Sequence, residues 1–128
     1  MKSVFELVAK HVEPSIKRSI VEALVEQGLP KAEIAKCLDI SPSLITRYLK
    51  KERGLHDFTR IPDVAERVRR LAGRIVYEKL CGNEAYMEIV KLVFHVLSRK
   101  YACSIHYLLD KSVNPATCHV CTELFKPM

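Results

Sequence analysis

Hydroxyl-bearing and cationic side chains share the segment from Ser41 to Arg53, which reads SPSLITRYLKKER. Its apolar members recur at helical spacing and would form one buried stripe: Leu44, Ile45, Tyr48 and Leu49. The opposite side of such a helix presents hydroxyl, guanidinium and ammonium groups. Hydroxyl and guanidinium groups can hydrogen-bond base edges in the major groove, and ammonium groups neutralise phosphates. The pattern therefore indicates a helix that reads double-stranded DNA.

Position along this helix separates two kinds of contact. Recognition helices place their N-terminal residues against base edges and their later cations against the DNA backbone. The residues that we assign to bases are Ser43, Thr46 and Arg47. The residues that we assign to phosphates are Lys50, Lys51 and Arg53. The alternative interpretation is a two-helix corner with a solvated basic face, as in many small helical proteins.

The residues before this helix predict a shorter helix and a tight turn. A buried face follows from apolar residues three and four positions apart: Ile34, Ala35 and Leu38. Asp39 then falls where the chain must turn with a positive φ, which aspartate tolerates. Ser41 and Pro42 are typical of an N-cap followed by the first helical position. Together these signals predict a helix-turn-helix.

The run EIAKCLDISPSLITRYLKKERG resembles the helix-turn-helix of lambda-repressor-like, Xre-type transcriptional regulators. It is most similar to a group of small archaeal predicted regulators, and the likeness extends over residues 15–54. The resemblance implies a cytoplasmic, dimeric DNA-binding regulator whose contacts come from Ser41, Ser43, Thr46, Arg47 and Lys50. Asp39 stands at the family's usual glycine, which affects the detailed turn conformation but not the motif.

Composition agrees with a phosphate-bearing partner. The 128-residue chain carries a net charge of +6, an excess of cations that is typical of nucleic-acid-binding proteins. No segment approaches the roughly 20 continuous apolar residues that span a bilayer. The N-terminus contains acidic residues and lacks the small-residue cleavage pattern of a signal peptide. We therefore expect a cytoplasmic protein without a membrane partner.

Helical signals continue along the chain, so the predicted fold is all-α. Ser3 and Glu6 have capping-box spacing and open a helix that we expect to end before Pro14. Gly28 is expected to end the next helix in a left-handed conformation. The predicted architecture is a lambda-repressor-like helix-turn-helix bundle, then a helical hairpin, then short C-terminal helices.

The segment 55–62, LHDFTRIP, lacks a clear period and is predicted to be a linker. We expect residues 1–60 to bind DNA and residues 61–128 to serve dimerisation and sensing. Helices over 63–80 and 84–101 would form the hairpin, and the apolar arc of the second is wider than one packing face needs. It should therefore pack against the C-terminal segment or a second subunit, as a homodimer reading a palindrome would require. A basic stripe on the first helix is expected to be an ordinary solvated face: Arg67, Arg70 and Arg74.

Five cysteines form the second unusual feature. Cys37 is most simply a small buried apolar residue of the first motif helix. The other four fall in the last 48 residues and could bind zinc or an iron-sulfur cluster as thiolates: Cys81, Cys103, Cys118 and Cys121. Cys118 and Cys121 have the two-residue gap that lets two thiolates share one metal. His106 and His119 are alternative fourth ligands.

Two other interpretations of the cysteines stay open. Asn114 and Pro115 suggest a helix start that would place Cys118 where the macrodipole lowers a thiol pKa, as in a redox switch. Alternatively, Cys81 and Cys103 are core residues and the remaining pair is incidental. A cytosolic chain would keep its thiols reduced, so permanent disulfides are not expected.

The sequence does not predict an enzyme. It contains no glycine-rich phosphate loop, no G-x-S-x-G, no H-E-x-x-H and no strand pattern on which a substrate cleft could be built. A thiol-disulfide exchanger using Cys118 and Cys121 is the one enzyme hypothesis, but such motifs accompany a βαβ unit. The predicted function is a sequence-specific transcriptional regulator. The alternatives are a non-specific architectural DNA-binding protein and an antitoxin-type protein-interaction module.

Overall fold

The computed structural model describes residues 3–126, and this range is helical with no β-strand. The α-helices are α1 Val4–Leu7, α2 Glu13–Glu26, α3 Lys31–Leu38, α4 Pro42–Leu49, α5 Pro62–Tyr77, α6 Gly82–Ser98, α7 Cys103–Leu109 and α8 Val120–Leu124. The all-α prediction is thereby confirmed. Within the described range no helix is both long enough and apolar enough to cross a bilayer.

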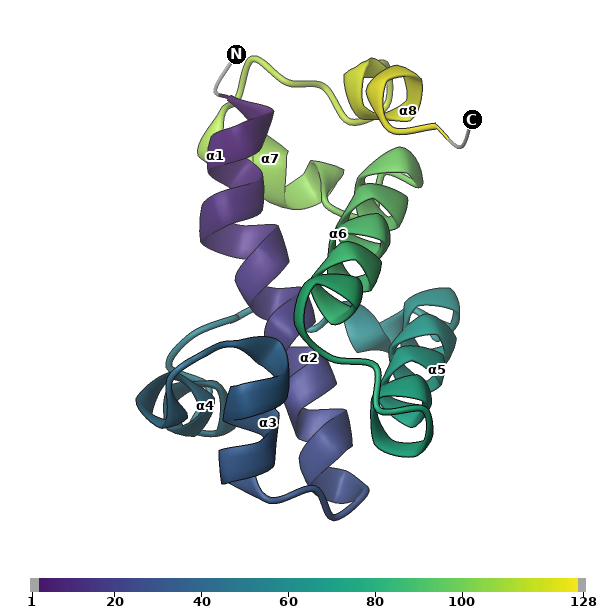
Figure 1. Ribbon diagram of the computed structural model, residues 1–128. Coiled ribbons are helices and arrows are strands. Elements are labelled where there is room, and N and C mark those ends of the chain that lie inside the picture. Colours follow the sequence, from purple (N-terminus) through teal and green to yellow (C-terminus); the bar gives the residue numbers. More distant parts are fainter. Residues whose placement is uncertain (1–2, 127–128) are drawn as a thin grey trace.

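A rod made of α1 and α2 runs through the length of the molecule (Figure 1). The pair α3 and α4 packs on one side of its lower half, and α5 packs on the other side. The upper half carries α6, with α7 and α8 closing the end at which the chain begins. The rod therefore contacts both the α3–α4 pair and the C-terminal helices.

The rod passes through Pro14, where the sequence predicted that it would end. A π-helical turn over Val8–Val12 joins α1 to α2, and the Glu13 N–H bonds to the Val8 carbonyl five residues back. Proline lacks an N–H and its ring clashes with the carbonyl four residues earlier in a regular α-helix. The wider π turn lies just before Pro14 and lets the helix continue. The predicted break was wrong because this local rearrangement leaves no signature in the apolar pattern.

One hydrophobic core joins residues from both sides of the predicted linker. Ile16 and Ile20 of α2 are fully buried, as are Val64 of α5 and Val96 of α6. The linker itself contributes Phe58, which is 4% exposed and belongs to a short 3-10 turn, Phe58–Arg60. The predicted domain boundary near residue 60 therefore does not separate two hydrophobic cores.

The helices α5 and α6 form the expected antiparallel hairpin. At one end His95 Nε2 donates to Asp63 Oδ2 at 2.5 Å, and the Tyr101 hydroxyl donates to the same oxygen at 3.1 Å. Nearer the turn, Arg74 and Glu88 pair at 3.7 Å. The basic stripe on α5 is neutralised by carboxylates, because Arg67, Arg70 and Arg74 each pair with an acidic residue. It is the solvated face that the sequence predicted.

Gly54 is required where the chain leaving α4 crosses the rod. Its φ is +69°, and a Cβ built there would lie 2.5 Å from the Pro14 carbonyl oxygen. Gly28 also has a positive φ, +92°, but a Cβ there would meet nothing within 4 Å. We expect Gly28→Ala to lower the free energy of unfolding by about 1 kcal/mol, from backbone strain alone. Gly54→Ala should cost about 3 kcal/mol because the backbone must also shift.

Chemical denaturation of both variants measures the difference. Equal losses for the two substitutions would contradict the close approach at Gly54.

Asp63 makes the stability of the hairpin depend on pH. The hydrogen bond from His95, with further ones from Arg67 and Tyr101, lowers the Asp63 pKa from 3.8 to about 2. A carboxyl whose pKa is depressed in the folded state contributes stability above its unfolded pKa, and that contribution is lost as the pH falls through the folded value. The unfolding free energy should therefore drop between about pH 4 and pH 2. Asp63→Asn should be less stable than the wild type near neutral pH and show a shallower drop.

Denaturation curves across this pH range, with Glu66→Gln as the matched substitution on the solvent side of α5, test the expectation. Parallel pH profiles for wild type and Asp63→Asn would disprove it.

Candidate nucleic-acid interface

The turn between α3 and α4 has the geometry that the sequence predicts. Asp39 adopts the left-handed conformation, with φ 55° and ψ 48°, and its N–H bonds to the Ala35 carbonyl. The Ile40 N–H bonds to the same carbonyl at 3.0 Å. Aspartate pays little steric cost here compared with a β-branched residue. The turn therefore closes without the glycine that the resemblance leads one to expect.

Ser41 and Pro42 begin α4 as predicted. The Ser41 Oγ accepts a hydrogen bond from the Leu44 N–H at 3.1 Å, which satisfies one of the free donors at the helix start. Pro42 occupies the first turn, where its missing N–H costs nothing. The start of α4 is thus fixed by local chemistry.

One face of α4 is buried against the rod and α3. Ile45 is fully buried and Tyr48 is 2% exposed, while Leu44 and Leu49 are half-buried against the same core. Burial raises the Tyr48 pKa, with Lys17 and Arg53 partly opposing the effect. The phenol therefore stays neutral, and this face acts as the anchor of α4.

The predicted DNA contacts lie at the N-cap of α4, on its solvent side and in the residues just after it. Six of these residues are exposed: Ser41, Ser43, Arg47, Lys50, Lys51 and Arg53. Thr46 is half-buried, and its Oγ1 donates to the Pro42 carbonyl at 3.2 Å, which leaves the hydroxyl oxygen able to accept. In residues 3–126 no carboxylate lies within ion-pair distance of the four cations of this set. This face contrasts with α5, whose arginines are all paired.

The segment that leaves α4 is tied to the rod by polar contacts. The His56 N–H bonds to the Ser15 Oγ at 3.2 Å, and the His56 ring lies 3.3 Å from the His11 ring nitrogen. Burial, then His11 and Arg18, lower the His56 pKa. These contacts hold the segment that follows α4 against the rod.

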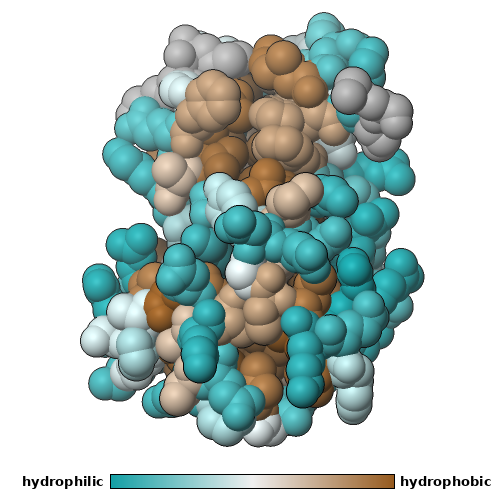
Figure 2. All heavy atoms as spheres, viewed as in Figure 1, coloured by the Kyte–Doolittle hydropathy of each residue, from teal (hydrophilic) through white to brown (hydrophobic). Residues whose placement is uncertain are grey.

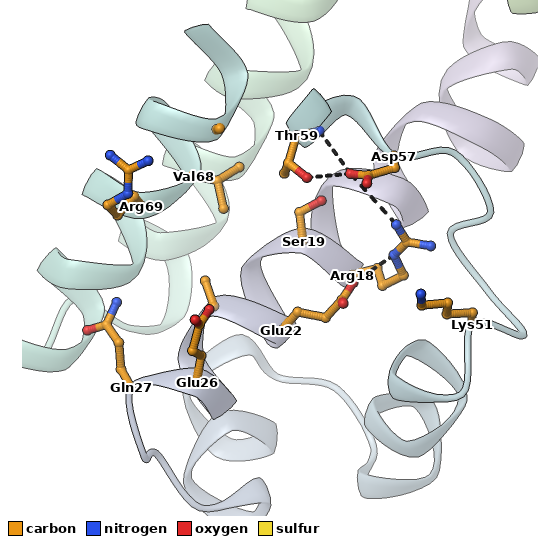
Figure 3. A pocket seen from close by; sticks show the side chains of 12 residues that line it. Arg18, Ser19, Glu22, Glu26, Gln27, Lys51, Asp57, Thr59, Val68 and Arg69 are labelled. Carbon is orange, nitrogen blue, oxygen red and sulfur yellow. Dashed lines mark hydrogen bonds and ion pairs between the residues drawn. The ribbon is translucent and has the colours of Figure 1, made fainter. Parts of the chain in front are cut away.

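Arg18 is the centre of a second set of contacts, in a groove of about 550 Å³ beside Lys51 (Figure 3). It is 5% exposed, and its Nε lies 2.9 Å from Glu22 Oε1 at an angle that makes an ion pair without a hydrogen bond. Its Nη2 lies 4.0 Å from Asp57 Oδ1. Hydrogen bonds from Thr59, and then the charge of Arg18, lower the Asp57 pKa. Sequence reasoning missed Arg18, because one cation on an amphipathic helix gives no sign that it is buried.

The structure corrects the interpretation of two cysteines. Cys37 and Cys81 form a disulfide with a Cα–Cα distance of 4.6 Å. Cys37 is buried as predicted, but it is bonded rather than an inert apolar residue, and Cys81 is not a thiolate ligand. The 17 residues of α6 separate Cys81 from Cys103 by about 25 Å, so Cys81 could not join the other three in one site. The pairing joins segments 44 residues apart, which spacing alone does not reveal.

The remaining cysteines lie at the other end of the molecule. Cys103 and Cys121 are buried, and burial raises both pKa values, that of Cys121 to about 11. Cys118 follows a turn in which Asn114 Oδ1 accepts from the Ala116 N–H, where a helix start was predicted. His106 is buried in α7, and His119 is exposed before α8. Across the described chain, no group of three or more histidine, cysteine or acidic side chains could hold a metal ion.

Comparison with known proteins adds no relative. No protein-family model, curated protein sequence or solved structure matches this chain. The function must therefore be argued from the geometry of α3, α4 and their supports.

The N-cap of α4 provides a test of the site's construction. Ser41→Ala removes the acceptor for the Leu44 N–H and should lower the free energy of unfolding by about 1 kcal/mol. Ser43→Ala is the matched control, because Ser43 is exposed and donates or accepts no side-chain hydrogen bond within residues 3–126. Thermal and chemical denaturation should separate the two variants. An unchanged stability for Ser41→Ala would show that the cap does not hold α4.

Proposed function

We propose that this chain is a cytoplasmic transcriptional regulator that binds double-stranded DNA by placing α4 in the major groove. One observation carries the proposal: α4 is anchored by a buried face, and α4 with the residues just after it presents exposed hydroxyl and cationic groups that no carboxylate of residues 3–126 neutralises. Cations held in this way attract phosphates, because an internal ion pair need not be broken first. The turn at Asp39 and the cap at Ser41 support a helix-turn-helix.

The roles of individual residues follow from their positions on α4. Ser43 and Arg47 are exposed in the first two turns and read base edges, with the Thr46 hydroxyl accepting from a base amino group. A guanidinium hydrogen-bonds guanine with two donors, so Arg47 carries most of the sequence preference. Ser41, at the N-terminus of α4, contacts the DNA at the edge of the groove. Lys50, Lys51 and Arg53 neutralise phosphates beyond the end of the helix.

A homodimer completes this proposal. Large apolar side chains gather at the end of the molecule that carries α7 and α8, the upper part of Figure 2. They are exposed by the following fractions: Phe5 80%, Phe94 45%, Leu108 69% and Leu124 65%. Phe94 already stacks on Phe125 with ring centroids 4.9 Å apart. A second copy that covers this end would place two α4 helices, the proposed DNA-reading helices, on one duplex and double the phosphate contacts.

Arg47→Ala tests the reading of bases. Duplexes are first selected from a random pool with the wild-type protein, and affinities are then measured by fluorescence anisotropy at several salt concentrations. We expect Arg47→Ala to lose about 1 to 3 kcal/mol of binding free energy on the selected duplex and little on a random one. Lys50→Ala should instead weaken binding to both duplexes and reduce the salt slope by about 1.

Arg70→Ala is the matched control, since Arg70 is exposed but pairs with Glu66 on α5. It should bind as the wild type does. If Arg47→Ala weakens all duplexes equally, the protein is an architectural DNA binder instead. If the wild type binds no duplex but captures an acidic protein, the interaction-module alternative replaces the proposal.

A further inference from the structure

The Cys37–Cys81 disulfide connects the helix-turn-helix to the C-terminal half. Cys37 lies on α3, the helix that precedes the proposed DNA-reading helix α4 (the reader). Cys81 is the N-cap residue of α6, in the turn after α5. The same region is where α3 packs against α6. The bond therefore fastens the first motif helix to the α5–α6 hairpin.

The two residues of this bond differ in exposure. Cys37 is 6% exposed, whereas Cys81 is exposed and so are the residues that follow it, 82–84. Lys79, two residues before Cys81, and Gly82, directly after it, have φ values of 54° and 63°, so the backbone leaves the helical path on both sides. A thiolate must approach a disulfide along the S–S axis, and only the Cys81 sulfur lies in a segment open to solvent.

No thiol of this chain is placed to make that attack within one molecule. The three free cysteines are Cys103, Cys118 and Cys121, at the far end of α6. The length of α6, about 25 Å, keeps them away from Cys81. Burial also raises the pKa values of Cys103 and Cys121, which keeps them protonated. Exchange at this bond therefore needs a thiol from outside.

We propose that Cys81 is a thiol–disulfide exchange site for an external dithiol, and that this exchange controls how firmly α3 is held. A thiolate of the dithiol attacks Cys81 Sγ and forms a mixed disulfide, while Cys37 leaves as a thiolate and takes a proton from water. The second thiolate of the dithiol then displaces Cys81, which is protonated in turn. The dithiol is oxidised to a disulfide, and its two electrons reduce the bond to two thiols.

Reduction acts on the reader through α3. The helix α4 packs on α2 and α3, and the turn that leads into it is closed by the Ala35 carbonyl of α3, which accepts from the Asp39 and Ile40 N–H groups. Once the bond is cut, α3 is held only by non-covalent packing, so the position of α4 is less restricted. A less restricted reader loses more conformational freedom on binding, and the reduced form binds DNA more weakly. This readout rests on the proposed function, whereas the exchange chemistry does not.

The first experiment follows the chemistry without DNA. Native protein is treated with dithiothreitol and, separately, with a dithiol protein; it is then unfolded and alkylated. The untreated protein has three free cysteines out of five, so it should take three alkyl groups and the treated protein five. A brief pulse of a monothiol such as glutathione should leave the mixed disulfide on Cys81 in peptide maps. A bond that resists dithiol until the protein is unfolded, or a mixed disulfide on Cys37, would overturn the proposal.

The second experiment measures the consequence for the reader. Hydrogen exchange of the α3 and α4 amides should accelerate in the reduced protein, and the affinity for a selected duplex should fall about fivefold or more. The Cys37→Ser/Cys81→Ser double variant is the control: it should behave as the reduced form and ignore dithiothreitol. If this variant does not fold, reoxidation of reduced wild type must restore both readouts.

The outcomes separate this inference from the proposed function. Loss of amide protection on reduction, with no DNA binding in either redox form, would overturn the proposed function. It would still support the proposal that exchange at Cys81 controls how firmly α3 is held. If DNA affinity and amide protection are equal in both redox forms, exchange at Cys81 does not control how α3 is held, and the proposed function is left intact.

Discussion

The burial of Ile45 and Tyr48 is the interaction on which the rest of the site depends. These side chains fix the rotation of α4 against the rod, so they decide which residues face the solvent. The local devices at Asp39 and Ser41 set only where α4 begins. A helix of eight residues is too short to be stable alone, and tertiary packing must supply most of its stability. The function proposed for the exposed face therefore rests on an apolar contact on the opposite face.

Cationic residues pair with acidic residues on α5, whereas within residues 3–126 those on and just after α4 do not. The sequence of α5 places acids four residues before arginines, as in Asp63 with Arg67 and Glu66 with Arg70, and these become ion pairs. The segment from Ser41 to Arg53 has one acid, Glu52, beside four cations. A positive surface that is available to phosphates therefore forms on α4 and the residues just after it, and not on α5. The spacing of acids relative to cations, and not the number of cations, distinguishes the two faces.

Local features of this fold could be predicted from the sequence, and long-range ones could not. Asp39, Ser41 and Gly28 act through their own backbone or the next turn, so residue type and position suffice to place them. The solvent-facing side of α4 follows from its period. By contrast, the Cys37–Cys81 bond and the buried Arg18 depend on which distant segments meet, and a single sequence does not record this. The helix end predicted at Pro14 was wrong for a third reason: the π turn before Pro14 lets the helix continue past a residue that normally ends one.

That π turn also sets the rotational register between the two parts of the rod. Successive residues of an α-helix are turned by about 100°, and a π turn closes over five residues where an α turn closes over four. Regular α-helical bonding through Val8–Val12, with no residue removed, would therefore swing α1 by about that angle. Leu7, now 3% exposed, would move off the face that meets the end of the molecule carrying α7. The face on which Leu7 lies therefore depends on the π turn as well as on the apolar period of the sequence.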